Sequence, residues 1–288
     1  MVTIAQLLKE GTRELIRANV PAARLDAEVL LYNLLEVERV YLYMYREKQV
    51  PGEVQEKFWY GIKKRAKHMP IQYIVNSQEF MGLDFWVEEG ILIPRADTEI
   101  LVEKVLDIYK NNYHPEMVKI MDIGTGSGAI AVSLAKYIDN CTVVAIDIHP
   151  NALKIADKNA DFHKVKDKIM FYSGDLFDPI DEQNEYGTYD FIISNPPYIP
   201  KFIIETLDSN VKDYEPRMAL DGGDDGLDFY RKIAKEAKKY LKKDSWLLFE
   251  IGYDQKKDVS KILNINGFKN VDVFKDLAGL DRVIVGET

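Results

Sequence analysis

The sequence predicts an α/β fold in which a mostly parallel sheet, covered by helices on both faces, follows a small N-terminal helical bundle. Beyond residue 94, apolar runs typical of strands alternate with segments of helical periodicity, which is the pattern of a parallel sheet with crossover helices. Before residue 72, apolar residues recur at helical spacing only. A glycine-rich turn after the first strand of the larger part is the third observation, because such turns bind ligands at the sheet edge.

The first 72 residues are expected to form the helical bundle. Their apolar residues recur at spacings of three and four, so each segment presents one apolar face. The basic run at residues 63–67 is interpreted as the solvated C-terminal end of the third helix. The three predicted faces are Ile4, Leu7, Leu8 and Leu15; Leu25, Val29, Leu30 and Leu34; and Val54, Phe58, Ile62 and Ala66.

Residues 73–93 have an extended pattern with turns at Gly82 and at Glu89-Gly90, which predicts a β-hairpin linking the bundle to the rest of the chain. Residues 94–288 are expected to form the α/β domain. Its seven candidate strands cover residues 119–123, 142–148, 169–173, 189–194, 245–251, 271–274 and 282–285.

Length and composition fit two domains without a membrane span. The chain has 288 residues, of which 47% are hydrophobic, enough for two packed interiors. No apolar run approaches the roughly 20 residues that span a bilayer, and the N-terminus lacks the pattern of a signal peptide. We therefore expect a cytoplasmic protein with no membrane partner, and a monomer.

Cysteine and histidine give no sign of metal or disulfide chemistry. The lone Cys141 cannot form an internal disulfide, and its place at the start of an apolar strand favours a packing role. The histidines lack the spacing of metal ligands, so we predict no metal site. They are His68, His114, His149 and His163.

The charge balance is acidic. A net charge of -9 and a pI of about 5.1 argue against a protein whose affinity depends on neutralising phosphates. Residues 1–75 contain 12 Lys and Arg against 9 Asp and Glu, which leaves 26 against 38 in the remainder. The α/β part is therefore the acidic part, and we expect no direct binding of nucleic acid.

The α/β part begins with a strand, a glycine turn and a helix in direct succession. The strand at residues 119–123 leads into Gly124-Thr125-Gly126-Ser127-Gly128, and helical residues 129–137 follow. Glycine lets the backbone approach a ligand closely, and the unpaired amides at the start of a helix attract anionic or polar groups. This succession predicts a nucleotide-type site.

The next two strands each end at candidate binding residues. Asp147 lies 23 residues after Gly124, at a strand end where a carboxylate can bind ribose hydroxyls. The third strand leads into Asp175 and Leu176, which are placed to meet the amine and the ring face of an adenine. The glycine turn also satisfies the loose dinucleotide fingerprint, so an NAD-dependent enzyme is an alternative at this point.

The fourth strand distinguishes these alternatives, because it leads into Asn195-Pro196-Pro197-Tyr198. The side-chain carbonyl of Asn195 and the backbone carbonyls of Asn195 and Pro196 can accept both protons of a planar NH2 group. The prolines stiffen the loop, and Tyr198 can stack on a flat group. A dehydrogenase has no evident use for this loop, whereas an enzyme that methylates nitrogen does. Asn195 is also expected to border the cofactor.

Further motifs extend over nearly the whole chain. They are ARLDAE at 23–28, PIQYI at 70–74, EFMG at 79–82, LIPRADTE at 92–99, the glycine turn, NPPY at 195–198, YEP at 214–216, GGDDGL at 222–227, EIG at 250–252 and LAGLDR at 277–282. In this combination the chain resembles the PrmC/HemK-type protein-(glutamine) methyltransferases that modify peptide chain release factors. It departs from that family at Ala96, where a proline is usual, and at Asn76, where a glycine is common.

The resemblance implies a Rossmann-like methyltransferase fold whose seven-stranded sheet ends in an antiparallel strand. It implies S-adenosyl-L-methionine as methyl donor, S-adenosyl-L-homocysteine as product, and the glutamine of the Gly-Gly-Gln loop in class 1 release factors as acceptor. The N-terminal bundle would be the docking surface, and residues 94–288 the catalytic domain. We expect direct in-line displacement, in which positioning can supply up to roughly 7 to 11 kcal/mol of the barrier.

The residues alone leave the acceptor open, because glutamine, adenine and guanine all present a planar NH2 group. A DNA or RNA amino-methyltransferase is the alternative, and it should show a basic groove and salt-dependent binding. A non-catalytic cofactor-binding module that docks on translation factors is a third possibility, against which the intact Asn195 loop argues. Arg95, Thr98 and Glu99 can line the pocket or begin a helix, and residues 201–213 can form a lid or a plain connection.

Overall fold

The computed structural model describes residues 2–112 and 116–288, which form two compact units. The first comprises the described residues up to Ser77, with Glu88–Gly90 and Asp208–Glu215. The second comprises Gln78–Val87, Ile91–Leu207 and Pro216–Thr288. None of the helices in the described ranges is long and apolar enough to cross a membrane. His114 lies outside the described residues.

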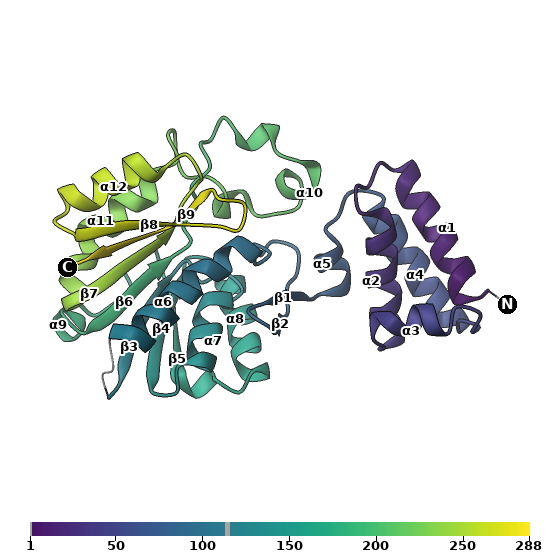
Figure 1. Cartoon of the computed structure of the whole chain (residues 1–288), viewed down its shortest axis with the longest axis horizontal. Coiled ribbons are helices and arrows are strands. Elements are labelled where there is room, and N and C mark those ends of the chain that lie inside the picture. The colour runs from purple at the N-terminus through teal and green to yellow at the C-terminus, as the bar shows by residue number, and fades with distance from the viewer. Residues whose placement is uncertain (1, 113–115) are drawn as a thin grey trace. The chain divides into compact units, whose positions relative to one another are not determined.

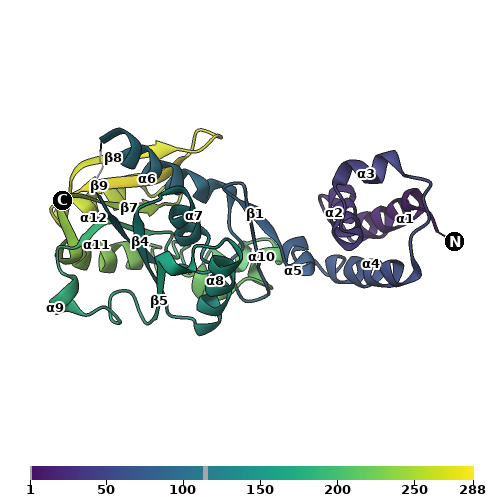
Figure 2. The same ribbon diagram turned by 90° about the horizontal axis from the view of Figure 1, so that it is seen from below.

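The first unit is a helical bundle, and Figures 1 and 2 show α1, α2 and α4 packed together. Thr3 begins α1 with a capping box, in which its hydroxyl accepts the amide of Gln6 at 3.3 Å and the Gln6 side chain accepts the amide of Thr3 at 3.0 Å. The predicted face of α1 is confirmed, since all four of its residues are buried. The helices are α1 (Ile4–Arg17), α2 (Ala23–Leu35), α3 (Arg39–Met44), α4 (Gly52–Arg65), α5 (Ile71–Val75) and the short α10 (Ser209–Lys212).

The predicted apolar face of α2 is only partly right. Leu30 is buried and Leu34 packs against the bundle core, but Leu25 is 44% exposed, whereas Asp26 and Glu28 are buried. The Asp26 carboxylate accepts a hydrogen bond from Arg65 of α4 at 2.7 Å, so Arg65 is buried and the basic run at residues 63–67 is not wholly solvated. Polar side chains that pair inside the bundle occupy positions that hydrophobic spacing alone assigns to the surface.

Glu28 shows the same effect. Arg39 Nη2 donates to one of its oxygens at 2.7 Å, the Tyr43 hydroxyl lies 2.8 Å from both, and Arg24 also pairs with it. Although burial opposes its ionisation, these hydrogen bonds hold the pKa of Glu28 below its ordinary value. The ARLDAE motif therefore carries buried, paired carboxylates of the bundle.

A two-stranded antiparallel hairpin, β1 (Gln78–Phe80) and β2 (Leu83–Phe85), begins the second unit. Its rings Phe80 and Phe85 are fully buried, with centroids 6.0 Å apart. The hairpin around Gly82 was predicted, but residues 73–75 are helical rather than extended because they belong to α5. That helix ends at Asn76 with φ of 55°, a left-handed conformation that glycine and asparagine adopt most readily.

The second unit is built on a seven-stranded sheet of order β5-β4-β3-β6-β7-β9-β8 (Figure 1). β9 is antiparallel to its neighbours β7 and β8, and the remaining pairs are parallel. The predicted fold class and the antiparallel last strand are confirmed. β7 begins at Leu241 rather than at Ser245, because a hydrophobic pattern does not reveal the charged residues 242–244 as part of a strand. The strands are β3 (Val118–Ile123), β4 (Cys141–Asp147), β5 (Ile169–Ser173), β6 (Tyr189–Ser194), β7 (Leu241–Glu250), β8 (Lys269–Lys275) and β9 (Asp281–Glu287).

Helices cover both faces of this sheet (Figure 1). α6 (Glu99–Asn112), α7 (Ala129–Tyr137) and α8 (Pro150–Phe162) lie on one face, and α11 (Asp228–Tyr240) and α12 (Lys256–Ile265) lie on the other. Successive strand residues alternate between the two cores, as Ile120 and Met121 do. The shorter elements are α9 (Glu182–Glu185), η1 (Ala96–Thr98), η2 (Lys166–Lys168), η3 (Ile204–Thr206) and η4 (Arg217–Ala219).

Strands β3, β4 and β6 end side by side. Ile123 of β3 is in register with Ile146 of β4 and with Ser194 of β6. Ligands of open parallel sheets bind at this carboxyl edge. The next residue along each strand is Gly124 after Ile123, Asp147 after Ile146 and Asn195 after Ser194. These three residues therefore lie together at the edge.

Candidate active site

The glycine turn has one side that is open. Gly124 and Gly126 have φ of 75° and 57°, values that side-chain-bearing residues rarely adopt. A Cβ atom built on either glycine would meet none of the described residues within 4 Å, apart from the glycine's own chain neighbours. A ligand can therefore approach the backbone of the turn closely at these two positions.

The other side of the turn is packed. Gly128, with φ of 81°, precedes α7, and a Cβ atom there would lie 2.9 Å from the Cβ of Ala156 in α8. The carbonyl of the buried Ser127 accepts a hydrogen bond from the Asn159 side chain at 2.9 Å. The turn is thus held against α8 while its open side stays accessible.

Asp147 ties the glycine turn to the end of β4. Its Oδ2 accepts the amide of Gly126 and its Oδ1 accepts the amide of His149, both at 2.8 Å. Burial raises the pKa of Asp147, whereas these two amides favour the ionised form. Each carboxylate oxygen keeps a second lone pair, so Asp147 can also accept hydrogen bonds from the hydroxyls of a ligand.

A further carboxyl group, which sequence reasoning missed, lies beneath the turn. Asp122 is fully buried, and its Oδ2 accepts the hydroxyl proton of the buried Thr125 at 2.6 Å. Burial raises the pKa of Asp122 to about 7. Because Thr125 is its partner, Asp122 supports the turn rather than a ligand. A charged residue inside an otherwise apolar strand was the signal that could have identified it.

Asp175 and Leu176 follow β5 at the same edge. The amide of Gly174 donates to the carbonyl oxygen of Asp147 at 3.1 Å, which joins the two strand ends. The Asp175 side chain is exposed, and the half-buried Leu176, with φ of 51°, packs on the second core. Their contact with an adenine stays a prediction.

Asn195 follows β6 where the loop is anchored to β3. The Ser194 hydroxyl donates to the carbonyl of Ile123 at 2.7 Å. The Asn195 amide Nδ2 donates to Thr98 Oγ1 at 3.1 Å, and its Oδ1 accepts no hydrogen bond from any part of the chain that the structure describes. Because Asn195 is only half-buried, this oxygen is an acceptor available to a ligand.

The rest of the loop is firmly placed. Pro196 is buried, whereas Pro197 and Tyr198 are half-buried. The Tyr198 hydroxyl donates to Glu250 Oε1 at 3.2 Å, and its ring packs against the second core. Burial raises the pKa of Tyr198, so the phenol stays protonated at neutral pH.

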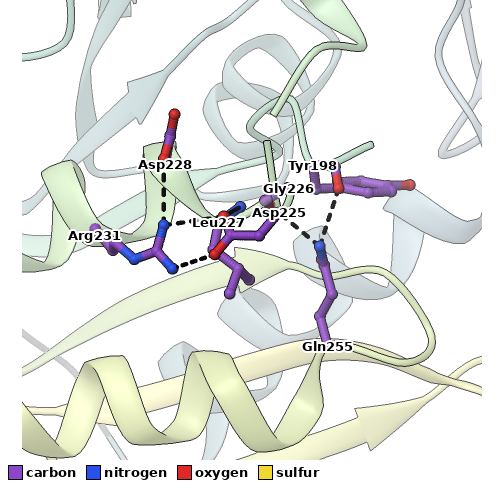
Figure 3. A network of polar contacts seen from close by, with 7 residues as sticks. All are labelled: Tyr198, Asp225, Gly226, Leu227, Asp228, Arg231 and Gln255. Atoms are coloured by element: carbon purple, nitrogen blue, oxygen red, sulfur yellow. Dashed lines mark hydrogen bonds and ion pairs between the residues drawn. The ribbon is translucent and has the colours of Figure 1, made fainter. Parts of the chain in front are cut away.

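Gln255 and the GGDDGL segment at residues 222–227 contact the backbone of the Asn195 loop (Figure 3). Gln255 Nε2 donates to the carbonyl oxygens of Tyr198 and Gly226 at 3.0 and 3.2 Å. Gly222 approaches so closely that a Cβ atom there would lie 2.8 Å from the carbonyl oxygen of Pro197. A Cβ atom on Gly226 would likewise lie too close to the carbonyl oxygen of Tyr198, so close backbone packing requires glycine at positions 222 and 226.

The same segment is ordered by one arginine. Arg231 of α11 pairs with Asp225 at 2.5 Å and with Asp228 at 3.2 Å (Figure 3). Asp225 also accepts the amide of Leu227 at 3.2 Å. The exposed ion pairs of Arg231 help to hold the GGDDGL segment in its conformation. This segment in turn packs against the Asn195 loop.

Thr98 and Glu250 reach the loop from distant parts of the chain. Thr98 Oγ1 donates to Glu250 Oε2 at 2.5 Å, and both side chains are buried. Burial raises the pKa of Glu250, although its hydrogen bonds favour the carboxylate. Thr98 therefore belongs to the site. Glu99 instead accepts the amide of Met81 at 2.6 Å and stabilises the hairpin.

Cys141 packs as predicted. It is buried, and burial raises the pKa of its thiol to about 11, which leaves it protonated and unreactive at neutral pH. Within the described ranges, no group of three or more His, Cys, Asp or Glu side chains is placed to hold a metal ion.

Known families and folds match both parts of the chain. A family described as the PrmC N-terminal domain matches residues 6–75, and one described as a methyltransferase domain matches residues 114–269. The hMettl16 catalytic domain, solved in complex with the MAT2A 3'UTR hairpin 6, is similar with a TM-score of 0.56 and 16% identity, over 82% of this chain and 81% of that chain. At this identity the likeness concerns the fold alone.

Curated relatives are similar over nearly their whole length. The release factor glutamine methyltransferase of Clostridium acetobutylicum is 44% identical over 261 residues, 90% of each chain. That of Geobacter sulfurreducens is 40% identical over 284 residues, 99% of this chain and 96% of the other. The resemblance carried by the motifs is confirmed: the chain is a methyltransferase and belongs to the release factor glutamine methyltransferase family.

Proposed function

We propose that the protein transfers a methyl group from S-adenosyl-L-methionine to the side-chain amide nitrogen of the glutamine in the Gly-Gly-Gln loop of class 1 peptide chain release factors. One observation carries the proposal. The Oδ1 of Asn195 has no partner among the described residues, and it lies at the same sheet edge as the open glycine turn. The names of the relatives, which specify release factor glutamine, support the choice of acceptor.

The residues at the carboxyl edge fit S-adenosyl-L-methionine. Gly124 and Gly126 leave open space beside the backbone, and Asp147 keeps lone pairs for ribose hydroxyls. When bound, the cofactor supplies a methyl group on a positively charged sulfur and leaves as S-adenosyl-L-homocysteine. The residues that we assign to its binding are Gly124, Thr125, Gly126, Ser127, Gly128, Asp147, Asp175, Leu176 and Asn195.

The Asn195 loop suits an amide acceptor. An amide nitrogen is a poor nucleophile because its lone pair is delocalised into the carbonyl. The Oδ1 of Asn195 and the backbone carbonyl of Pro196 would accept its two protons, which orients the nitrogen and stabilises the positive charge that develops on it. Pro197 stiffens the loop and Tyr198 would stack on the amide plane. These four residues are the proposed catalytic set, and positioning is their main contribution.

We propose that residues 1–72 dock the release factor, residues 73–93 link, and residues 94–288 catalyse. The bundle offers an apolar surface on α3, where Val40, Tyr43 and Met44 are 59%, 51% and 66% exposed. Exposed apolar residues that cluster in this way are typical of protein contacts. We expect the enzyme to act as a cytoplasmic monomer on a protein substrate.

An exocyclic amine of DNA or RNA is the alternative acceptor, because it presents the same planar NH2 group. The net charge of -9 makes this alternative less favourable, since nucleic-acid binding depends on cationic surfaces. Strong weakening of substrate binding by salt would favour it.

The test is transfer of labelled methyl from S-adenosyl-L-methionine to a purified class 1 release factor, followed by mass spectrometry of the modified peptide. The matched control is the same factor with alanine in place of the loop glutamine. We expect label on that glutamine alone. Transfer to RNA or DNA instead would establish the alternative acceptor, and binding of both ligands without transfer would indicate a non-catalytic module.

A further inference from the structure

The contact between Thr98 and Asn195 has a fixed direction. The Thr98 hydroxyl carries one proton, and this proton is donated to Glu250 Oε2 at 2.5 Å. The Thr98 oxygen is then left with acceptor capacity only. It accepts from Asn195 Nδ2 at 3.1 Å.

This direction determines how the Asn195 amide is oriented. If the amide were flipped, its Oδ1 would face a Thr98 oxygen that has no proton left to donate. Two acceptors would then meet in a buried place, and the hydrogen bond would be lost. With Nδ2 toward Thr98, the carbonyl oxygen occupies the end of the amide that has no partner among the described residues.

Glu250 maintains this arrangement as an acceptor with two donors. Its Oε2 accepts from Thr98, and its Oε1 accepts from Tyr198 at 3.2 Å. Burial of the carboxyl group raises its pKa, whereas the hydrogen bonds from Thr98 and Tyr198 and the charge of Arg282 favour the ionised form, and Asp97 opposes it. Arg282 in turn lies 3.2 Å from Asp97, which reduces that opposition.

We propose that Thr98 and Glu250 are positioning residues that fix the amide orientation of Asn195, so that its carbonyl oxygen and not its NH2 group faces the acceptor amide. The catalytic consequence rests on the proposed function, because an NH2 group turned toward the acceptor would meet a second donor. The orientation itself rests only on the hydrogen bonds among the three side chains.

The first test compares Thr98→Val with Thr98→Ser in methyl transfer to the release factor. Valine keeps the shape of threonine but removes the hydroxyl, and we expect kcat to fall about tenfold or more, since a defined hydrogen bond is lost. Serine keeps the hydroxyl and should restore kcat to near the wild-type value. The Kd for S-adenosyl-L-methionine should be the same in both variants as in the wild type. A wild-type kcat in Thr98→Val would overturn the proposal.

A matched control separates this effect from the loss of any buried hydroxyl. Ser245 is fully buried in the middle of β7, five residues before Glu250, and its hydroxyl donates to the carbonyl of Lys242 at 2.6 Å. Ser245→Ala should lower the melting temperature without lowering kcat. Where Thr98→Val folds poorly, Thr98→Ala takes its place, since alanine removes the same donor and acceptor.

The second test asks whether Thr98 acts through Asn195. Adding Thr98→Val to Asn195→Ala should cause no further loss of kcat, because the side chain that Thr98 orients is already absent. An equal fold-loss in both backgrounds would show that Thr98 acts independently, and would contradict the proposal.

A readout without turnover keeps the inference separate from the proposed function. The side-chain NH2 resonances of Asn195 can be assigned in ¹⁵N spectra by their loss in Asn195→Ala. In the free enzyme we expect them to move in Thr98→Val and to stay in place in Thr98→Ser. Unmoved resonances in Thr98→Val would refute the orientation even if the enzyme methylates its factor. The expected movement with no methyl transfer would refute only the proposed function.

Discussion

Asp122 shows how strongly a single buried residue of the site depends on its surroundings. It has no solvent contact, and burial raises its pKa from 3.8 to about 7. The folded protein therefore holds a proton on Asp122 between about pH 4 and pH 7, where the unfolded chain has released it. A group of this kind contributes stability below its unfolded pKa, and loses that contribution as pH rises through its folded pKa.

We predict that Asp122→Asn removes this pH dependence. Over the window from about pH 4 to pH 7, the contribution of Asp122 to the free energy of unfolding should fall by up to about 4 kcal/mol. Asparagine can still accept the Thr125 proton and has no ionisable proton to lose. Urea unfolding of both proteins from pH 5 to pH 8 should therefore show the variant gaining relative stability as pH rises. Parallel stability curves would contradict the assignment.

At the residue scale, sequence reasoning identified site residues that lie in or next to a recognisable motif. It missed the hydrogen-bond partners that distant segments of the chain contribute. Asp147 and Asn195 each follow a recognisable strand, and both lie at the predicted sheet edge. The residues that hold Asn195 in place do not adjoin its motif. Thr98, its direct partner, is 97 residues away, and Glu250, the partner of Thr98, is 152 residues from Thr98. Propensity and periodicity are local, so a hydrogen bond across such distances needs the folded chain.

At the scale of elements, the start of α7 serves two purposes through glycines that look equivalent in the sequence. Gly124 faces open space, whereas Gly128 fits against Ala156 of α8. Both have positive φ, so both substitutions to alanine carry backbone strain of about 1 to 2 kcal/mol. Only the second also forces a steric clash between two helices.

We therefore predict that Gly128→Ala lowers the free energy of unfolding by about 2 to 4 kcal/mol, because overpacking adds to the strain. Gly124→Ala should cost about 1 to 2 kcal/mol and should weaken cofactor binding more than its stability loss explains. Chemical unfolding and cofactor titration on the two variants check this. Equal destabilisation with equal cofactor affinity would show that the open and packed sides were assigned wrongly.

The bundle helices α2 and α4 are joined by the buried Asp26–Arg65 pair. Arg65→Ala would leave a buried carboxylate without its partner, and we expect it to destabilise the first unit by about 3 to 5 kcal/mol. Lys57→Ala, on the same helix, removes an exposed pair with Glu53 and should leave stability nearly unchanged.

Thermal unfolding of both variants tests this difference, and replacement of both buried partners by apolar residues should recover most of the loss. Similar melting temperatures for Arg65→Ala and Lys57→Ala would contradict it. This pair also explains why the α2 face was predicted only in part, since the hydrophobic pattern of α2 cannot show that Asp26 has a buried partner 39 residues away.

At the scale of the whole molecule, regular alternation made the fold predictable. Strands such as β5 and β6 were predicted with their observed bounds, because a short, mainly apolar and aromatic run defines each of them. β7 was predicted too short, because the charged residues 242–244 lie in a register shift between Leu241 and Trp246, the residues that pair with β6 on either side. The motifs added the family, which the curated relatives confirm. At the sheet edge, we propose a division of roles in which Asn195 serves the acceptor and Asp147 serves the cofactor.

The most direct test of that division compares Asn195→Ala with Asp147→Ala, measuring kcat on a release factor and the Kd for S-adenosyl-L-methionine. We predict that Asn195→Ala lowers kcat by about a hundredfold while the Kd changes little, since its free oxygen serves the acceptor. Asp147→Ala should raise the Kd first, because its carboxylate serves the cofactor. Normal turnover in the first variant, or wild-type cofactor affinity in the second, would contradict the central claim that one sheet edge holds the two reactants through separate residues.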